Sequence, residues 1–478
     1  MSGNLLNLNG LNFDTGGYLH SQLSPLELRA LATGEAVDRK ELQEMKDWCE
    51  SRGPHYGMVA GRDYKKLEDT GWGVIFAHEP EPGVYEALKP LLDLRRAQAS
   101  AKDEALYKEY KGTDGYLPED TKRLFAKRHG AGVSGVVDPR KIPYYLLIVG
   151  DPETIPYLFQ YQLDVQYGVG RIHFDKLEDY AQYAASVVAA ETGKIRLPRK
   201  AAFFGVAKEG DPATILSSRY LVDPLRKAVT EDQKNKWSVE AFLGEQATKK
   251  TLGNLLGGTD TPAFLFGASH GMGGKRGSPQ QYSDQGALIC QDWPGNEWKG
   301  AMRPYYYAAE DLGSEAKLGG TIAMFFACYG AGTPKFNEFR QKDSLTEPNQ
   351  IAEKAFVSAL PKRMLSHPNG GALAVIGHVE RAWSCSFQAG KETIQIQTFE
   401  SSLKKLLDGY PVGYATEEFN CRYAELSSEL LELMPQLKAG MKPTDEFVNL
   451  WTENYDARNY SLIGDPAVRM AVAEDPAP

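Results

Sequence analysis

A cysteine and a histidine each follow a short apolar run that is bounded by glycines. Cys328 comes two residues after the run 321–326, and His270 comes three residues after the run 263–267. Such runs are typical of buried parallel strands, and active sites of open α/β folds lie at the carboxyl ends of these strands. The sequence therefore predicts a thiol and an imidazole at one edge of a sheet, as in a cysteine-nucleophile hydrolase.

The residues around this pair favour a catalytic role. An attacking thiolate needs a lowered pKa or an adjacent base, so His270 is expected to take the proton of Cys328 and to protonate the leaving amine. Gly271 has no side chain, and its N–H is expected to form an oxyanion hole with the N–H of Cys328. The structural alternatives are a buried free thiol and an ordinary loop histidine. The small neighbours Ser269 and Ala327 fit an open cleft better.

Length and composition describe an ordinary globular protein. The chain has 478 residues, of which 42% are hydrophobic and 24% charged, and this length allows two or three domains. The net charge of -9 argues against a nucleic-acid partner. The first residues have no basic region followed by an apolar core, and no apolar run reaches bilayer length, so neither a secretory signal nor a membrane span is expected.

The cysteines indicate a reducing compartment. Their number is odd and their spacing is wide and irregular, which fits neither a disulfide framework nor a zinc ligand set. We therefore expect a cytoplasmic protein that keeps its thiols reduced. The five cysteines are Cys49, Cys290, Cys328, Cys385 and Cys421.

Strand and helix patterns alternate in the second half of the chain, which predicts a mostly parallel sheet covered on both faces. The segment 195–199 (IRLPR) is expected to be a linker, so we predict an N-terminal α/β subdomain (1–195) and a catalytic domain (196–478). Further strands are expected at 72–77, 144–149, 201–206, 239–242 and 371–377. Helices are expected at 25–31, 38–49, 84–98, 177–192, 212–230, 248–256, 305–313, 351–360, 393–407 and 417–433. A mobile charged surface segment, which can contain a helix, is expected at 99–141.

The two strand ends resemble the caspase-like superfamily of cysteine peptidases, which includes caspases, legumains, gingipains and the CHAT proteases. The residues that carry this resemblance are SHG (269–271) and, later in the chain, FACYG (326–330). Caspases have Gln-Ala-Cys-[Arg/Gln/Gly]-Gly with the histidine about fifty residues upstream. This chain departs from that signature at Phe326 and Tyr329, so it is not a caspase proper, and cleavage after Asp is not expected.

Four further segments resemble gingipain-type peptidases. They are YLLIVGDPETIP (145–156), GVGRI (168–172), GALAVIGHVERAW (371–383) and YSLIGDPAVR (460–469). The resemblance runs from about residue 140 to about residue 470. It implies a caspase-like three-layer α/β/α fold and endopeptidase activity through a Cys–His dyad and an acyl-enzyme.

Three residues are expected to bind substrate: Asp164 and Trp383, which the same resemblance implies, and His378, which ends a neighbouring strand. Asp164 lies near the place of an acidic S1 residue, which would suit a P1 Arg or Lys. Trp383 would form an aromatic wall of the pocket, and His378 would line the cleft. The alternatives are a surface or turn aspartate, a core tryptophan and a histidine outside the site. The Lys275-Arg276 pair would be a natural self-cleavage site for such an enzyme, although an ordinary solvated loop is the favoured explanation.

The sequence contains none of the common motifs for nucleotide binding, zinc binding or serine-hydrolase activity. The sequence has no GxxxxGK[ST], HExxH, CxxC or GxSxG pattern and no EF-hand loop, so no cofactor and no metal are expected. Two alternatives to an endopeptidase stay open. One is a non-catalytic scaffold or regulatory pseudo-protease, and the other is a cysteine-dependent transpeptidase or ligase, which also forms an acyl-enzyme. The expected partner is a protein or peptide substrate, and an activating or inhibitory protein is left open.

Overall fold

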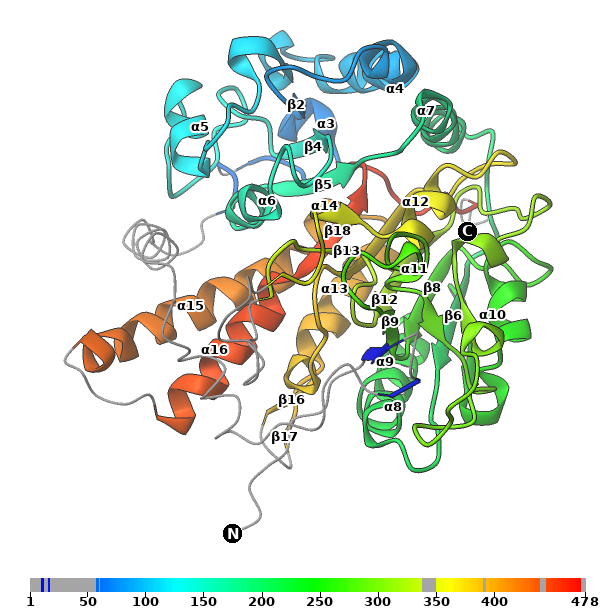
Figure 1. Cartoon of the computed structure of the whole chain (residues 1–478). Helices are drawn as coiled ribbons and strands as arrows, with labels where there is room; N and C mark the ends of the chain where they lie inside the picture. Colours follow the sequence, from blue (N-terminus) through cyan, green and yellow to red (C-terminus); the bar gives the residue numbers. More distant parts are fainter. Residues whose placement is uncertain are drawn as a thin grey trace.

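The computed structural model describes residues 10–12, 16–17, 57–59, 61–337, 350–389, 393–438 and 444–473. Its centre is a ten-stranded sheet with a single antiparallel junction, so the predicted mostly parallel α/β architecture is confirmed (Figure 1). In sheet order the strands are β3 (Tyr107–Tyr110), β2 (Trp72–Phe76), β4 (Tyr145–Val149), β5 (Gly168–Ile172), β18 (Tyr460–Gly464), β15 (Ala374–His378), β12 (Ile322–Phe326), β8 (Phe264–Ala268), β6 (Lys200–Gly205) and β7 (Ser238–Leu243).

Strand β18 joins the two halves of this sheet. It is parallel to β5 on one side and antiparallel to β15 on the other, and Figure 1 shows it in red between the N-terminal strands and the green strands. The strands of the two halves therefore run in opposite directions, and the amino end of β5 lies at the same edge as the carboxyl ends of β8, β12 and β15. The division into subdomains at 195/196 stays a prediction, because strands from both sides of it share one sheet.

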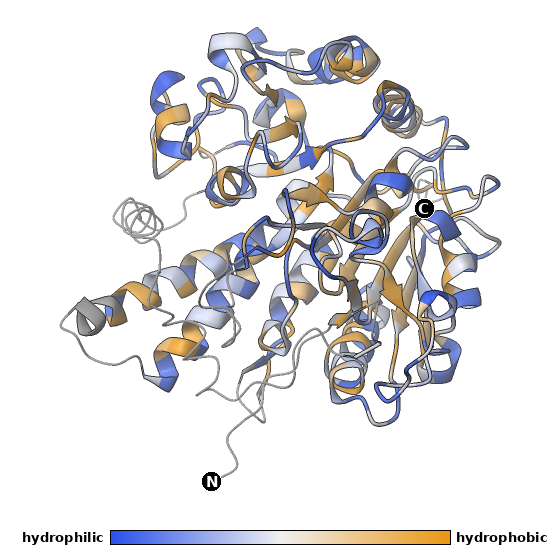
Figure 2. Cartoon of the chain, viewed as in Figure 1, coloured by the Kyte–Doolittle hydropathy of each residue, from blue (hydrophilic) through white to orange (hydrophobic). Residues whose placement is uncertain are grey.

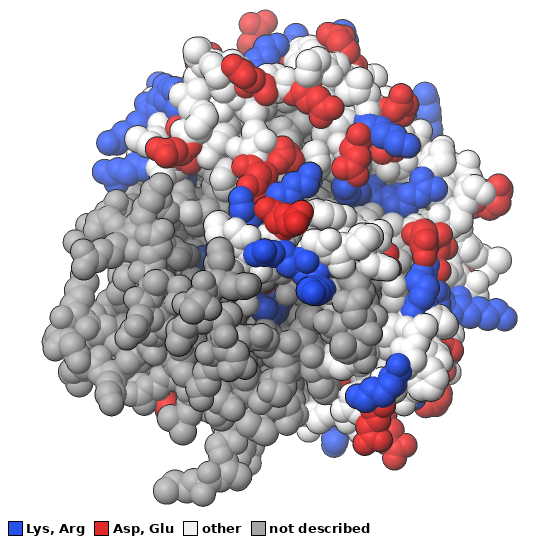
Figure 3. All heavy atoms as spheres, viewed as in Figure 1, with Lys and Arg blue, Asp and Glu red and all other residues white. Residues whose placement is uncertain are grey.

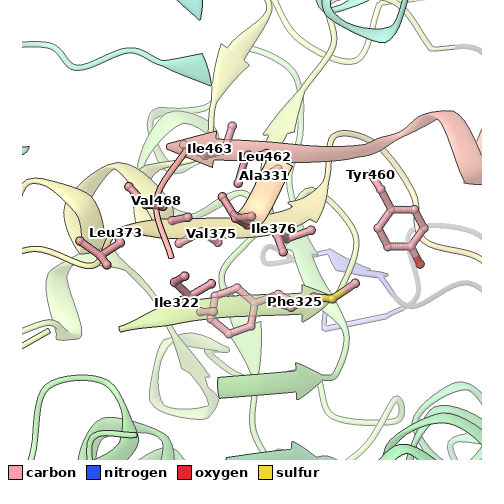
Figure 4. Packing of buried hydrophobic residues seen from close by; sticks show 14 of the residues in the cluster. Ile322, Phe325, Ala331, Leu373, Val375, Ile376, Tyr460, Leu462, Ile463 and Val468 are labelled. Carbon is pink, nitrogen blue, oxygen red and sulfur yellow. The ribbon is translucent and has the colours of Figure 1, made fainter. Parts of the chain in front are cut away.

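Seven central strands, β2, β4, β5, β8, β12, β15 and β18, are buried at every residue. Burial of both faces explains why these strands are continuous apolar runs in the sequence. Figure 4 shows Ile322, Val375 and Ile463 packed across three neighbouring strands. Figure 2 shows hydrophobic residues gathered along the strands, with hydrophilic residues on the outer turns of helices.

Helices connect the strands. They are α3 (Leu67–Thr70), α4 (Val84–Ala99), α5 (Lys122–Arg128), α6 (Tyr157–Asp164), α7 (Leu177–Glu191), α8 (Pro212–Ser217), α9 (Asp223–Asp232), α10 (Lys249–Leu255), α11 (Pro279–Asp284), α12 (Ala359–Leu365), α13 (Gln397–Leu407), α14 (Val412–Ala415), α15 (Glu417–Lys438) and α16 (Asp445–Arg458). A π-helical turn, Ser218–Val222, joins α8 to α9, so the helix predicted at 212–230 is present with one irregular turn. The predicted helices 25–31 and 38–49 lie outside the described residues.

Three predicted segments are wrong. Residues 305–313 are not a helix, because Tyr306 and Tyr307 form β11 and pair with β10 (Leu288–Ile289). The helix predicted at 351–360 begins only at Ala359, because β14 (Phe356–Val357) pairs with β13 (Gly332–Thr333). The segment 99–141, predicted as a mobile charged surface that can contain a helix, contains the helix α5 but also the strand β3, which was not predicted. In each case pairing or packing between distant parts of the chain overrides the local pattern.

A smaller sheet lies beside the carboxyl edge of β8. Its order is β1 (Gly10–Asn12), β9 (Gly271–Gly273), β10 and β11, and Figure 1 shows β1 as a dark-blue strand next to β9. A separate apolar cluster packs against it, formed by Leu11, Met272, Ala287, Ile289, Trp293, Met302, Tyr306 and Ala308.

A buried ion pair ties the N-terminal half to the end of β18. Asp465 accepts hydrogen bonds from Arg95 Nε at 2.7 Å and from the indole of Trp72 at 2.9 Å, and the Arg95 and Asp465 side chains have no exposed surface. The exposed pair Lys89–Asp93 has the same chemistry at the surface of the same helix, α4.

The Asp465→Ala variant is expected to lose about 3–5 kcal/mol of unfolding free energy, because it leaves the Arg95 guanidinium buried without its main partner. Asp93→Ala is the matched control, with an expected loss of about 0–1 kcal/mol. Urea unfolding of both variants measures the difference. Equal midpoints would show that the buried pair does not hold the halves together.

Candidate active site

The structure brings Cys328 and His270 to the same level of the sheet. Strands β12 and β8 are parallel neighbours, with Phe326 opposite Ala268, and each candidate residue follows two positions later. Gly271 packs directly on the backbone of Cys328: a Cβ at Gly271 would lie 1.8 Å from the Cys328 carbonyl oxygen. A side chain cannot be accommodated there, which explains why glycine follows His270.

The Cys328 thiol is held in a closed environment. It has no exposed surface, and its Sγ accepts a hydrogen bond from the N–H of Ala382 at 3.3 Å. Burial raises the pKa of the thiol to about 12, although the Ala382 N–H and the nearby Arg381 act in the opposite direction. The thiol is therefore protonated at neutral pH in this structure, and attack requires a base and a more open arrangement.

His270 is positioned by a carboxylate and a tryptophan. Its Nε2 lies 2.8 Å from Asp211 Oδ2, and both side chains are buried. Asp211 Oδ2 also accepts the hydroxyl of Thr214 at 2.7 Å, and Trp293 contacts the imidazole edge-on at 5.9 Å between ring centroids. A carboxylate only accepts hydrogen bonds, so Nε2 carries the proton and Nδ1 is the basic nitrogen.

Asp211 is a candidate functional residue that the sequence analysis did not predict. It follows β6, the neighbour of β8, and precedes α8. It belongs to one of three Gly-Asp-Pro segments in the chain (150–152, 210–212 and 464–466). Asp151 closes its own turn by binding Thr154, and Asp465 binds Arg95. The available signal was the position of Asp211 after a strand that neighbours the histidine strand.

The segment that follows β15 crosses over the cysteine. The backbone carbonyl of Glu380 accepts a hydrogen bond from the N–H of Tyr329 at 2.7 Å, and the carbonyl of His378 accepts one from the N–H of Ala331 at 2.9 Å. Glu380 and Arg381 form a buried ion pair, and both influence the thiol of Cys328 electrostatically. The segment that follows β15 thus brings one acidic and one basic residue into the electrostatic environment of the Cys328 thiol.

His378 has a structural environment. Its Nε2 donates to the carbonyl of Asp456 at 2.9 Å and lies 3.2 Å from the carboxylate of the same residue. Asp456 also accepts the N–H of Trp383 at 2.9 Å, and Trp383 is 1% exposed. His378 and Trp383 therefore help to fix the loop over Cys328, and their predicted contact with substrate stays a prediction.

Asp164 is not brought next to the dyad by any described contact. It ends α6 shortly before the amino end of β5, is 8% exposed and accepts a hydrogen bond from the backbone of Val169. Burial raises the pKa of its carboxyl well above the usual range, which favours the uncharged acid. Its assignment as the S1 residue stays a prediction.

Several surroundings of the site are also defined within the described residues. A cavity of about 690 Å³ opens between the N-terminal half and α11 and α12, lined by Asp151, His173 and Lys362 among others; neither Cys328 nor His270 lines it. Among the described residues, no group of His, Cys, Asp and Glu side chains is arranged so that it could hold a metal ion. Lys275 and Arg276 are exposed in the loop after β9. On the face seen in Figure 3, charges of both signs are interspersed among the residues that are not grey.

No helix in the described ranges is both long and apolar enough to cross a membrane. The described cysteines, Cys290, Cys328, Cys385 and Cys421, are all free thiols.

Comparisons with known proteins identify a peptidase relationship. The model of Peptidase family C25 matches residues 349–471, a range that contains the loop over Cys328 and β18 but begins after His270 and Cys328. No curated protein sequence gives a significant match.

Solved structures of cysteine peptidases are similar at low identity. The Arg-specific cysteine proteinase gingipain R is 12% identical, with 87% of this chain and 80% of that chain covered and a TM-score of 0.48. The complex of the pro- and mature domains of RgpB from Porphyromonas gingivalis is 10% identical, with 84% of this chain and 79% of that chain covered and a TM-score of 0.45. The Saccharomyces cerevisiae separase–securin complex is 9% identical, with 72% of this chain and 17% of that chain covered and a TM-score of 0.31. The family match agrees with the resemblance found in the sequence: in its C-terminal part, residues 349–471, the chain is similar to Peptidase family C25.

Proposed function

We propose that the protein is an endopeptidase in which Cys328 is the nucleophile and His270 the general acid and base. The observation that carries this proposal is the placement of both residues at the ends of adjacent parallel strands, with the imidazole held by Asp211. His270 Nδ1 takes the thiol proton, and the Cys328 sulfur attacks the scissile carbonyl. The N–H groups of Gly271 and Cys328 stabilise the oxyanion.

The remaining steps use the same groups. The peptide C–N bond breaks as His270 gives its proton to the leaving amine, which leaves an acyl-enzyme on Cys328. Water then attacks the thioester carbonyl and gives a proton to His270, the C–S bond breaks, and the acid product departs. An amine acceptor in place of water would make the same site a ligase. Product analysis with added amine distinguishes the two reactions.

We propose that the residue before the scissile bond is Arg or Lys. The resemblance to gingipain-type peptidases supports this preference. Two acids are candidates for the S1 site. One is Asp164, which the resemblance points to. The other is Glu380, whose backbone carbonyl accepts a hydrogen bond from the N–H of Tyr329 and whose carboxylate is paired with Arg381. A P1 guanidinium could replace Arg381 as the partner of Glu380. Intracellular location, self-processing at Lys275-Arg276 and regulation by a partner remain proposals from the sequence.

A panel of fluorogenic peptides tests the proposal, with P1 varied over Arg, Lys, Asp, Asn, Leu and Ala. Wild type is expected to cleave after Arg and Lys, and the S1 acid is the one whose amide variant, Glu380→Gln or Asp164→Asn, lowers kcat/KM for these peptides about 10- to 100-fold. The other variant serves as its control. Cleavage after Asp or an apolar residue would keep the mechanism and reject the acidic pocket. Silence across the panel in a protein with an exposed, reactive Cys328 would reject the endopeptidase.

A further inference from the structure

The outer edge of β9 is occupied by a strand from the beginning of the chain. Strand β1 runs parallel to β9, with Gly10 opposite Gly271, Leu11 opposite Met272 and Asn12 opposite Gly273. The two strands are separated by about 260 positions of sequence (271 − 10 = 261). A segment distant in sequence therefore pairs with the residue that follows the candidate catalytic histidine.

The hydrogen bonds of β9 show which backbone groups face β1. On the β10 side, the N–H of Met272 donates to Ala287 and the carbonyl of His270 accepts from Ile289. Gly271 and Leu288 are therefore a non-hydrogen-bonded pair of the antiparallel ladder, and the backbone N–H and C=O of Gly271 do not bond to β10. Successive backbone groups of a strand point to opposite sides, so the N–H and C=O of Gly271 point toward β1.

This orientation concerns catalysis directly. The Gly271 N–H is one of the two donors proposed for the oxyanion hole. In this structure the edge that carries it faces the N-terminal strand, and His270 and Cys328 next to it have no exposed surface. A substrate backbone that approaches this donor must therefore compete with β1.

One leucine anchors β1 in place. The side chain of Leu11 is fully buried in the cluster that contains Met272 and Trp293, and Trp293 in turn packs edge-on against the imidazole of His270. Nearby, a Cβ added at Gly16 would lie 2.8 Å from the sulfur of Met302, which belongs to the same cluster. The described part of the N-terminal segment thus packs on the apolar cluster beside His270.

We propose that the outer edge of β9 is a binding edge for an extended polypeptide substrate, and that residues 10–12 occupy it as an intramolecular inhibitor. The inference rests on the proposed endopeptidase function and adds where the substrate backbone binds and how the site is kept closed. Extended peptides commonly bind proteins by adding a strand to a free sheet edge. Within the described residues, β1 is three residues long and Leu11 is its buried apolar side chain, so we expect that a substrate or an activating peptide can displace it.

The Leu11→Asp variant of the full chain tests this proposal, because it places a charge in the apolar cluster and should release β1. Two rates are measured: alkylation of Cys328 by iodoacetamide, followed by mass spectrometry of the Cys328 peptide, and hydrolysis of the best P1 peptide. Both are expected to rise at least about tenfold over wild type, a difference of about 1.4 kcal/mol. Leu124→Asp, at a half-exposed leucine of α5, is the matched control and should leave both rates unchanged.

A synthetic peptide of residues 6–17 extends the test. Added to the Leu11→Asp variant, it is expected to lower both rates toward those of wild type. If the variant folds, by thermal denaturation, but alkylates and cleaves at the wild-type rates, β1 is merely structural and the inference is overturned. If Leu11→Asp does not fold, Leu11→Ala is measured with the same criteria. Faster alkylation without any peptide hydrolysis would support the occupied edge and reject the endopeptidase, so the two failures are distinguishable.

Discussion

The Cys328→Ala variant is expected to lose at least about 10⁴-fold in kcat/KM on the best peptide while retaining wild-type stability. Removal of a catalytic nucleophile eliminates the acyl-enzyme path, and what remains is the smaller acceleration from binding and the oxyanion donors. The folded state should tolerate the change, because the Sγ atom makes one described hydrogen bond, with Ala382, and alanine fills most of the same space.

The control for this prediction is Cys421→Ala, a partly exposed free thiol on α15. It is expected to cleave at the wild-type rate. A mechanism-based acyl probe with the preferred P1 residue should add covalently to wild type and to Cys421→Ala and should not add to Cys328→Ala. Undiminished cleavage by Cys328→Ala would remove this thiol from the mechanism, whichever peptide is used.

The Asp211→Asn variant is expected to lower kcat by about 10²–10⁴-fold with little change in KM. An amide in place of the carboxylate can donate to Nε2, which favours the imidazole tautomer with its proton on Nδ1, the nitrogen that must accept the thiol proton. Asp211 does not touch the reacting atoms in this account, so it is a positioning residue, and substrate binding should be preserved.

Thr214→Val is the matched control, because Thr214 donates to the same carboxylate oxygen at 2.7 Å and its loss leaves the imidazole contact in place. A decrease of less than about tenfold is expected for it. Thermal unfolding of both variants separates a local effect from a loss of fold. If Asp211→Asn and Thr214→Val lowered kcat equally, or if KM rose instead, the carboxylate would not orient the histidine.

The central strands could be predicted from the sequence because both of their faces are buried. The runs that became β8, β12, β15 and β4 are apolar at nearly every position and end at glycine or a turn, and their predicted bounds differ from the observed ones by one to three residues. The same pattern predicted that Cys328 and His270 lie at one edge of the sheet, because residues that directly follow two parallel strands meet at the same edge. Burial pattern alone could not give strand direction, and the reversal at β18 was not foreseen.

Other features depend on contacts between distant residues and left no local pattern. Strand β1 is Gly-Leu-Asn, too short for any periodicity, and only its pairing with β9 makes it a strand. Asp211 and His270 are 59 positions apart, and a lone aspartate after a strand resembles the turn residues Asp151 and Asp465. Tyr306 and Tyr307 have helical neighbours in sequence, but pairing with β10 decides their conformation. In the charged segment 99–141, the sequence did not predict that Phe125 of α5 would be buried in the core.

The central position of β18 has a consequence for biosynthesis. Residues 460–464 are the last strand of the large sheet to be made, and yet they separate β5 from β15 in the middle of it. A nascent chain that ends before residue 460 has two half-sheets with unpaired edges and lacks the Asp465 carboxylate that binds Arg95. Because domains form from the N-terminus during synthesis, each half can become ordered on the ribosome, but they can join only when β18 emerges. The complete sheet, and any proteolytic activity that depends on it, can therefore form only after residues 460–464 have been synthesised and have left the ribosome.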